Sequence, residues 1–317
     1  MFSYLHQPKG FYKHLFLLAL PVIVQNLITT SLGFLDTFMV GLLGSDQMSA
    51  VTVANVPVFI IQLVVFGLQS GSSVLISQYW GRGDRESINR VMGIGFMIAG
   101  GVSVLFAAIL CAFPAQVLYL ITDNLTLVEL AEPYLRIVGF SYIFNSLSSI
   151  YIGMQRSIEN PRFGMIVFAI SMLCNTLGNY VLIFGRFGAP ELGIRGAAIG
   201  TLVARIVELG IVVVYMLKID KKLKLFSENF MKFDAALRKD YAKVEIPVML
   251  SQVLWAVSVP FQTAILGHLS SDAIAANSVA TTFYQYLKVI VLAMSSSSAV
   301  MIGASVGRGD MKRVKSD

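Results

Sequence analysis

The sequence predicts an all-α polytopic membrane protein with about eight transmembrane helices, arranged as one complete six-helix lobe plus the first two helices of a second parallel repeat. Three observations predict this fold class. Hydrophobic residues form 56% of the 317-residue chain and charged residues 13%, with a mean hydropathy of +0.73, which is more apolar surface than one soluble core can bury. Stretches long enough to span a bilayer recur along the chain. A motif from the first third of the chain also returns near its end.

Eight apolar stretches have the length of about 20 residues that a membrane-spanning helix requires. We place them at 14–41, 50–79, 92–115, 134–155, 163–185, 196–217, 243–266 and 278–305. We expect the first stretch to remain as a span, because it is long and lacks the small-residue cleavage site of a signal peptide. Cys111 and Cys174 both fall inside apolar stretches, so the sequence does not indicate a disulfide framework.

Lysine and arginine gather in alternate loops, which predicts the orientation of the chain. They occur before the first stretch and after the second, fourth, sixth and eighth, whereas the loops 42–49 and 116–133 contain none. The loop between the fifth and sixth stretches is an exception that keeps Arg186 and Arg195. By the positive-inside rule we expect the N-terminus to be cytoplasmic. The net charge of +6 then requires no nucleic-acid partner.

An internal repeat divides the chain into domains. An offset of 226 residues aligns, without a gap, Gly81–Asp84 on Gly307–Asp310, Pro21 on Pro247, Gly41 on Gly267 and Asp46 on Asp272. Of the 56 pairs from Asp36 and Gln262 onward, 17 are identical. A repeat unit of six spans, an even number, gives both copies the same orientation. We therefore expect a six-helix lobe over 1–217, a basic cytoplasmic linker over 218–242 and the start of a second lobe over 243–317.

The repeated Gly-Arg-Gly-Asp motif is expected to have a structural role. Glycine commonly ends helices, and the arginine would hold the following loop on the cytoplasmic side. A nucleotide-binding role is disfavoured, because the motif lacks the strand and helix of a dinucleotide-binding fold.

Five motifs of the chain form a specific set, namely LPVIVQNL, DTFMVGLLG, GLQSGSSVLISQYWGRGD, CNTLGNYVLIFG and GIRGAAIGTLVARIVE. As a set they resemble the multidrug and toxic compound extrusion (MATE) family of cation-coupled efflux antiporters, and the similarity covers the whole chain. The resemblance implies twelve helices in two lobes around a central cavity. The chain is then expected to be C-terminally incomplete, ending where the ninth helix would begin.

The resemblance implies a secondary active transporter that exports cationic or amphipathic drugs in exchange for Na⁺ or H⁺ and so confers antibiotic resistance. It implies no enzyme activity, no cofactor beyond the coupling ion, and a location among the lipids of a bacterial plasma membrane. A complete transporter would need the missing C-terminal helices or another chain. Two alternatives stay open. One is a truncated membrane polypeptide that does not transport, and the other is a flippase for lipid-linked sugars of the same superfamily, whose cavity would carry several arginines.

Asp36 is the candidate for cation coupling, because a carboxylate within an apolar span is costly unless it faces water, a partner or a cation. It stands five residues before Gly41, so a plain position at the outer helix end is the alternative. The resemblance implies the coupling role, since family members place an acidic residue here. Such a carboxylate can carry a proton or, with oxygen ligands around it, Na⁺.

Asn175, Asn179 and Thr201 are candidates for those oxygen ligands. The two asparagines are spaced i, i+4 and so project from one helical face. Thr201 follows a run of small residues that allows helices to approach closely. In the family pattern the position of Asn179 is commonly aspartate, so this site has one carboxylate fewer. Hydrogen bonding between helices without an ion is the alternative. Beyond a Na⁺ at this coupling site, the sequence predicts no metal.

Further charged residues lie well inside the predicted spans, away from their ends. Arg205 and Glu208, three residues apart, are expected to form a buried ion pair with a structural role. Lys288 could extend to the outer interface or line the cavity, and the sequence leaves both open.

The second lobe differs from the family pattern. Gln262 stands at the repeat partner of Asp36, and Gln252 and Trp255 stand near the place where many Na⁺-coupled members have a glutamate. Glu245 lies at the cytoplasmic end of its span, so coupling through this lobe is doubtful. Aromatic residues could form walls for a cationic drug, although packing is their commoner role: Phe34, Phe59, Phe66, Tyr142, Phe144, Trp255 and Tyr284.

Overall fold

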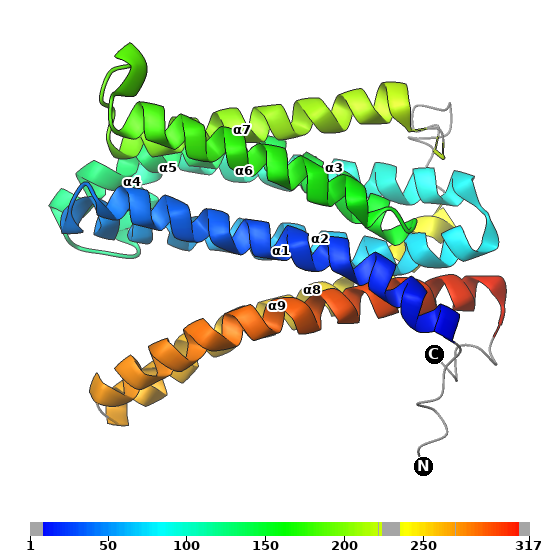
Figure 1. Ribbon diagram of the computed structural model, residues 1–317. Coiled ribbons are helices and arrows are strands. Elements are labelled where there is room, and N and C mark those ends of the chain that lie inside the picture. Colours follow the sequence, from blue (N-terminus) through cyan, green and yellow to red (C-terminus); the bar gives the residue numbers. More distant parts are fainter. Residues whose placement is uncertain (1–8, 221, 224–234, 270, 311–317) are drawn as a thin grey trace.

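The computed structural model describes residues 9–220, 222–223, 235–269 and 271–310, with some side chains in the last two helices outside the description (Figure 1). The regular secondary structure of the described part is entirely helical, and this part contains no strand. Its helices are α1 Lys9–Gly41, α2 Ser45–Arg82, α3 Arg85–Ala112, α4 Pro114–Tyr119, α5 Leu125–Ser157, α6 Pro161–Ile183, α7 Ile194–Val214, α8 Ala235–Leu269 and α9 Ser271–Arg308, with short turns at Arg186–Gly188 and Tyr215–Ile219.

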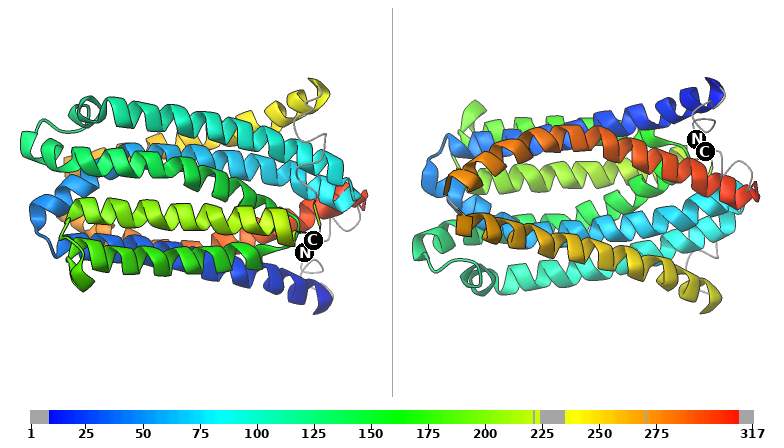
Figure 2. Two further views of the ribbon diagram at one scale, coloured as in Figure 1. Left: turned by 90° about the horizontal axis from the view of Figure 1, so that it is seen from above. Right: turned by 90° about the horizontal axis from the view of Figure 1, so that it is seen from below.

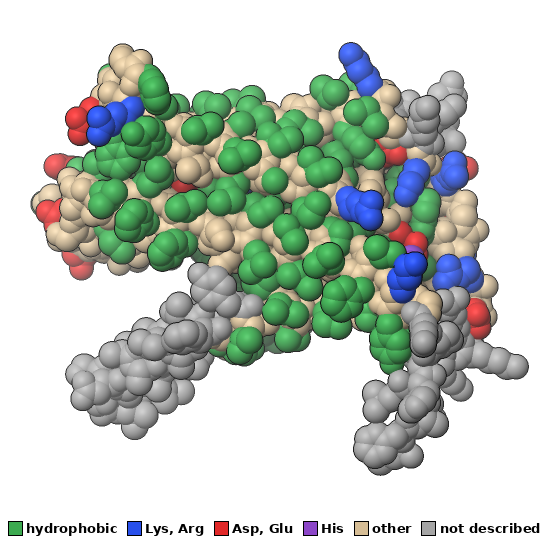
Figure 3. Space-filling view, in the orientation of Figure 1, with side chains coloured by type: hydrophobic (Ala, Val, Ile, Leu, Met, Phe, Trp, Pro, Cys, Tyr) green, Lys and Arg blue, Asp and Glu red, His purple; other side chains and the backbone are tan. Residues whose placement is uncertain are grey.

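Seven helices of the described residues are long and apolar enough to cross a membrane, which confirms the predicted class of an all-α polytopic membrane protein. They fall on seven of the eight predicted spans. The remaining one, predicted at 243–266, lies within α8, where many side chains are outside the description. Figure 3 shows the expected exterior on the face in view, with hydrophobic side chains along the bundle and most charged side chains toward its two ends.

Helix ends differ from prediction where local capping overrides hydropathy. Helix α5 begins at Leu125, nine residues before the predicted 134. The Asn124 side chain accepts hydrogen bonds from the backbone nitrogens of Thr126 and Leu127 at 3.1 and 3.3 Å, which stabilises the first turn outside the apolar stretch. The short helix α4, which begins with Pro114 at its first turn, was not predicted.

Helix α5 has a central place among the first six long helices. Helix α5 packs on α2, α3 and α7, while α6 packs on α7 and α1. Two buried clusters fill the interior, one around Tyr151 and one around Leu135. Helices α8 and α9 pack on α2, and α9 also on α1 (Figure 2). Figure 1 shows that α9 lies near α1 at one end and diverges from it toward the other.

We call the end of the bundle where α2 and α9 terminate the basic end; it carries Lys13, Arg82, Arg85, Arg162 and Arg308. We call the opposite end, with Asp46, Asp123, Glu132 and Glu191, the far end.

Helices α2 and α9 cross at the basic end through three close contacts. A Cβ added to Gly81 would overlap the backbone of Ala304, and one added to Gly307 would overlap the backbone of Gln78. A Cβ added to Gly303 would overlap the Ser77 side chain. The repeat offset of 226 residues pairs 77 with 303, 78 with 304, and 81 with 307, so the crossing is symmetric between the repeats. Small residues permit this approach of two backbones.

The repeated motif therefore has three structural tasks. Its first glycine, Gly81 or Gly307, allows α2 and α9 to approach each other closely where they cross. Its second glycine, Gly83 or Gly309, adopts a positive φ of 75° or 74° just beyond the helix end, a conformation that favours glycine. In the first copy its aspartate, Asp84, then caps α3 by accepting a hydrogen bond from the Ser87 backbone nitrogen at 3.0 Å.

The chain after α7 is fastened to α5 by a polar contact. One Asp220 carboxylate oxygen accepts hydrogen bonds from the Tyr151 hydroxyl at 2.8 Å and from Gln155 Nε2 at 2.6 Å. The Lys222 Nζ lies 5.5 Å from the ring centroid of Trp80. The start of the predicted linker, 218–242, is thus held against α5 by Asp220. Its end belongs to a helix, because α8 already begins at Ala235. Residues 224–234 lie outside the described part.

Candidate functional site

A cavity of about 1080 Å³ lies between the first six long helices and the pair α8–α9. Every long helix except α3 contributes to its lining. The polar and charged lining includes Asp36 from α1, Gln62 from α2, Tyr142 from α5, Thr201 and Arg205 from α7, and Lys288 from α9. A polar cavity at the interface of two repeats is where transporters of this architecture bind their ligands.

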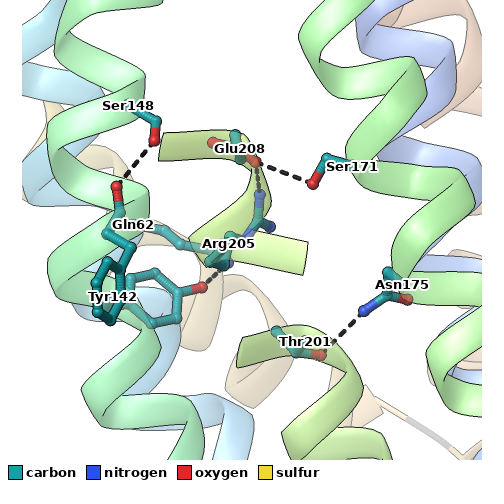
Figure 4. Close-up of polar contacts among 9 residues, drawn as sticks. Gln62, Tyr142, Ser148, Ser171, Asn175, Thr201, Arg205 and Glu208 are labelled. Atoms are coloured by element: carbon teal, nitrogen blue, oxygen red, sulfur yellow. Dashed lines mark hydrogen bonds and ion pairs between the residues drawn. The ribbon is translucent and has the colours of Figure 1, made fainter. Parts of the chain in front are cut away.

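Four sequence-predicted site residues form one chain of hydrogen bonds beside this cavity. Asn179 Nδ2 donates to Asp36 Oδ1 at 2.6 Å and is 3.2 Å from Asn175 Oδ1. Asn175 Nδ2 donates to Thr201 Oγ1 at 3.1 Å, as Figure 4 shows. The structure thus joins three helices, α1, α6 and α7, through residues that are up to 165 positions apart in the sequence.

Asn179 is the buried centre of this chain. It is fully buried, and its side-chain oxygen has no hydrogen-bond partner among the described residues. A Cβ added to Gly200 would overlap that oxygen, so a glycine on α7 is what lets the amide fit between the helices. An orphaned amide oxygen beside a carboxylate fits a cation or a proton-bearing group, because each would supply the missing positive charge or donor.

The residues around Asp36 could hold Na⁺ with oxygen ligands alone. The set comprises the Asp36 carboxylate, the two asparagine amide oxygens and the Thr201 hydroxyl, the oxygen chemistry that hard cations prefer. It contains a single formal negative charge. The same carboxylate can instead bind a proton.

Arg205 and Glu208 lie within ion-pair distance, as expected from the sequence. Arg205 Nη1 is 2.6 Å from Glu208 Oε2, and the same oxygen accepts a hydrogen bond from Ser171 Oγ at 3.0 Å (Figure 4). Glu208 is fully buried, whereas Arg205 reaches the cavity. The pair therefore places a largely neutralised guanidinium in the cavity wall.

The second repeat contributes Lys288 and Trp255. The Lys288 Nζ lies 4.5 Å from the ring centroid of Trp255, and both residues line the cavity. The structure thus favours the cavity position for Lys288 over an interfacial one. Phe59, Phe66, Tyr142 and Trp255 of the predicted aromatic set line the cavity, whereas Phe34, Phe144 and Tyr284 do not. The side chain of Gln262 lies outside the described residues.

Sequence reasoning missed a row of amides on α2. Asn55, Gln62 and Gln69 all line the cavity, and Gln62 Nε2 donates a hydrogen bond to the Tyr142 hydroxyl at 2.5 Å. The three residues are spaced seven apart, so they fall on one face of a helix. That spacing within an apolar span was a usable signal, because intramembrane polar side chains usually face a protein interior or water.

This fold and this site define a polytopic membrane protein with a polar cavity between two repeats. The family model described as MatE matches residues 21–181 and 247–316, which is most of the chain. The chain therefore belongs to the MATE family of multidrug efflux transporters.

Relatives and solved structures agree with this assignment. "Probable multidrug resistance protein NorM" of Rhizobium meliloti is 28% identical over 317 residues, covering 97% of this chain and 66% of the relative. "Multidrug resistance protein MdtK" of Edwardsiella ictaluri is 26% identical over 300 residues, covering 94% and 65%. The chain spans about two thirds of the length of these curated relatives.

Two solved structures share the fold. A crystal structure of MATE in complex with MaL6 has a TM-score of 0.87 at 20% identity, over 96% of this chain and 67% of that one. An outward-facing multidrug resistance MATE family transporter has a TM-score of 0.85 at 20% identity, over 96% and 66%. At this identity the likeness concerns the fold alone.

Proposed function

We propose that this chain forms part of a secondary active transporter that exports cationic or amphipathic drugs in exchange for Na⁺ or H⁺, with Asp36 as the coupling carboxylate. The observation that carries the proposal is the hydrogen-bonded chain from Asp36 to Thr201 at the edge of a cavity between two repeats. The names of the relatives as multidrug resistance proteins support the substrate class.

Charge in the cavity favours Asp36 for this role. It is the one acidic side chain among the described residues that line the cavity. Of the two basic side chains there, Arg205 is paired with Glu208, and Lys288 lies over the Trp255 ring. An ion and a cationic drug would both need the negative charge of Asp36. Binding of one therefore weakens binding of the other, and this competition couples their transport.

The orientation of the bundle fits export. If the basic end faces the cytoplasm, as the positive-inside rule predicts, the α2–α9 crossing closes the cytoplasmic side and the diverging ends of α8 and α9 face outward. An impermeant thiol reagent should then label Asp46→Cys on intact cells but not Lys13→Cys, both at exposed positions. Labelling of Lys13→Cys from outside would reverse the orientation.

The direct test replaces the coupling carboxylate in the full-length transporter. We expect Asp36→Asn to lower ion-driven drug efflux by at least about tenfold, because the amide cannot release a proton or neutralise a cation. The amount of protein in the membrane should stay the same, since the amide can still bond to Asn179. Efflux is measured with a fluorescent cationic substrate in cells that lack their own pumps.

Asp46→Asn is the matched control, since it removes an exposed carboxylate at the far end of the bundle. It should leave efflux unchanged. Undiminished efflux by Asp36→Asn would rule out the proposed coupling role.

Two alternatives are separated by further observations. A lipid-linked sugar flippase is not favoured, because Arg205 is the one arginine among the described lining residues and Glu208 neutralises it. The second alternative, a polypeptide without transport of its own, is tested with the same efflux assay on residues 1–317. We expect no efflux from that chain alone, because alternating access needs two complete repeats.

A further inference from the structure

A second buried carboxylate, Glu245, lies away from the cavity on the part of α8 nearest the basic end. It is 6% exposed, and neither of its carboxylate oxygens has a hydrogen-bond partner among the described residues. Glu208, the other buried acid, is paired with an arginine and a serine. Glu245 has no such partner, although an unpaired buried carboxylate is strongly unfavourable.

The carboxyl group of Glu245 lies against the backbone of α2. A Cβ added to Gly71 would overlap its oxygens, so the glycine provides the space that the carboxyl occupies. The adjacent Ser72 Oγ is 3.0 Å from the Tyr241 hydroxyl, one turn before Glu245 on α8. Glu245 thus sits in the contact between the first repeat and the second, where α2 and α8 pack.

No basic group among the described residues compensates this carboxyl. On α8 the titratable neighbour is Tyr241, whose hydroxyl already contacts Ser72. On α2 the facing residues are Gly71 and Ser72, and the titratable Tyr79 lies two turns nearer the basic end. On α3, Arg90 is paired with Glu86.

The two basic residues of α9, both of them described, are engaged elsewhere. Arg308 donates a hydrogen bond to Ser305, and Lys288 lies over Trp255. Among the described residues, the ion pairs of the structure leave Glu245 out.

We propose that Glu245 is a proton-binding site of the interface between the repeats: it holds a proton while α8 lies against α2 and releases it to water when the two helices separate at the basic end. The neutral acid costs far less to bury than the carboxylate does. Separation would expose the group to water, where the ionised form is stable. The closed interface therefore binds one proton more than the open one.

The surroundings fit a proton better than a metal ion. Hard cations take about six oxygen ligands in proteins. Among the described residues, the side chain found to interact with the carboxyl is Tyr241, and its hydroxyl lies 3.0 Å from Ser72 Oγ. The carboxyl also lies directly on the α2 backbone, which leaves no gap for an ion between them.

This site is distinct from the proposed coupling site at Asp36. It requires that the two repeats separate at the basic end during transport, but it does not require Asp36 to bind the coupling ion. Loss of coupling in Asp36→Asn and loss of proton binding in Glu245→Gln are therefore independent results.

The first test is infrared spectroscopy of the chain reconstituted in phosphatidylcholine and phosphatidylglycerol nanodiscs at neutral pH. We expect a protonated-carboxyl carbonyl band that Glu245→Gln removes. Glu191→Gln, which changes an exposed glutamate at the far end, should keep the band. An identical spectrum in Glu245→Gln and the unchanged chain would overturn the proposal, because Glu245 would then be ionised.

The second test follows the interface itself. Spin labels at Arg85→Cys and Arg308→Cys, both exposed, report the distance between the repeats at the basic end, with Cys111 and Cys174 replaced by serine. A one-proton difference predicts that the ratio of closed to open interface falls by up to about tenfold per unit rise in pH. Glu191→Gln should behave like the parent chain, while Glu245→Gln should stay closed at every pH. The same pH dependence with and without Glu245, or none in either, would overturn the proposal.

Discussion

The two repeats meet through symmetric contacts between α2 and α9 at the basic end, but they place different side chains in the cavity lining. At the basic end, Gly81 meets the backbone of Ala304 as Gly307 meets that of Gln78. In the cavity lining, Gln62 of the first repeat corresponds to Lys288 of the second. By the same offset Asp36 corresponds to Gln262, whose side chain lies outside the described residues. The contact between Gly81 and Ala304 is therefore repeated by the contact between Gly307 and Gln78, with glycine kept at both equivalent positions, whereas the cavity positions differ.

The difference between crossing and cavity has a physical reason. A residue whose Cβ points at the backbone of the other helix must be small, so Gly81 and its repeat partner Gly307 are both glycine. A cavity imposes no such steric limit, and the side chains that line it can change with the ligand. The acidic group of the cavity thus belongs to the first repeat and the unpaired basic group to the second.

The largest effect is expected where the two repeats are equivalent. Gly81→Val and Gly307→Val should each lower the free energy of unfolding by about 1–3 kcal/mol, because each side chain would overlap the backbone of the other helix. Thermal unfolding of the purified chain in detergent measures this. The two variants should agree with each other, since their contacts are related by the repeat.

Gly101→Val is the control for that pair. A Cβ added to Gly101 meets nothing within 4 Å, so the substitution should be close to neutral. Equal destabilisation by all three variants would mean that the α2–α9 crossing contributes no specific stability.

A smaller effect should follow from adding a carboxylate to the first repeat. Asn179→Asp places a second negative charge beside Asp36, which strengthens cation binding at the oxygen cluster. We expect the ion concentration for half-maximal efflux by the full-length transporter to change by about tenfold, with drug affinity within about twofold. Asn124→Asp is the matched control, because aspartate is an equally good helix cap and this position is far from the cavity. A larger change in drug affinity than in ion dependence would contradict the assignment.

The smallest effect should come from making the second repeat resemble the first. Lys288→Gln gives the cavity the side chain of Gln62 and removes a positive charge, so the affinity for a lipophilic cation such as tetraphenylphosphonium should rise by about threefold. Equilibrium binding to the reconstituted chain measures it. Lys13→Gln, at an exposed position on the basic end, should leave the affinity unchanged. If the affinity for an uncharged analogue rose equally, the effect would come from the lost packing of Lys288 over Trp255, and the loss of its charge would not explain it.

Several features could be predicted because they depend on local composition. A span of about 20 apolar residues has few alternatives to a membrane helix, so seven predicted spans appear as helices in the described residues. The buried pair Arg205–Glu208 followed from a spacing of three residues on one helix. The ends of helices were less predictable, because Asn124 starts α5 through its side-chain hydrogen bonds, a contact that hydropathy does not reflect.

By itself the sequence determined the membrane class and the internal repeat. It also indicated Asp36, Asn175, Asn179 and Thr201 as candidate site residues, because polar side chains are costly in an apolar span. Only the tertiary structure decided which groups meet. It joined Asp36 to Asn179, placed Lys288 over Trp255, and left Glu245 against Gly71 with no hydrogen-bond partner among the described residues. The physical reason is that hydrophobicity acts on each segment by its own composition, whereas a hydrogen bond or an unpaired buried charge depends on what a distant helix brings to within about 3 Å.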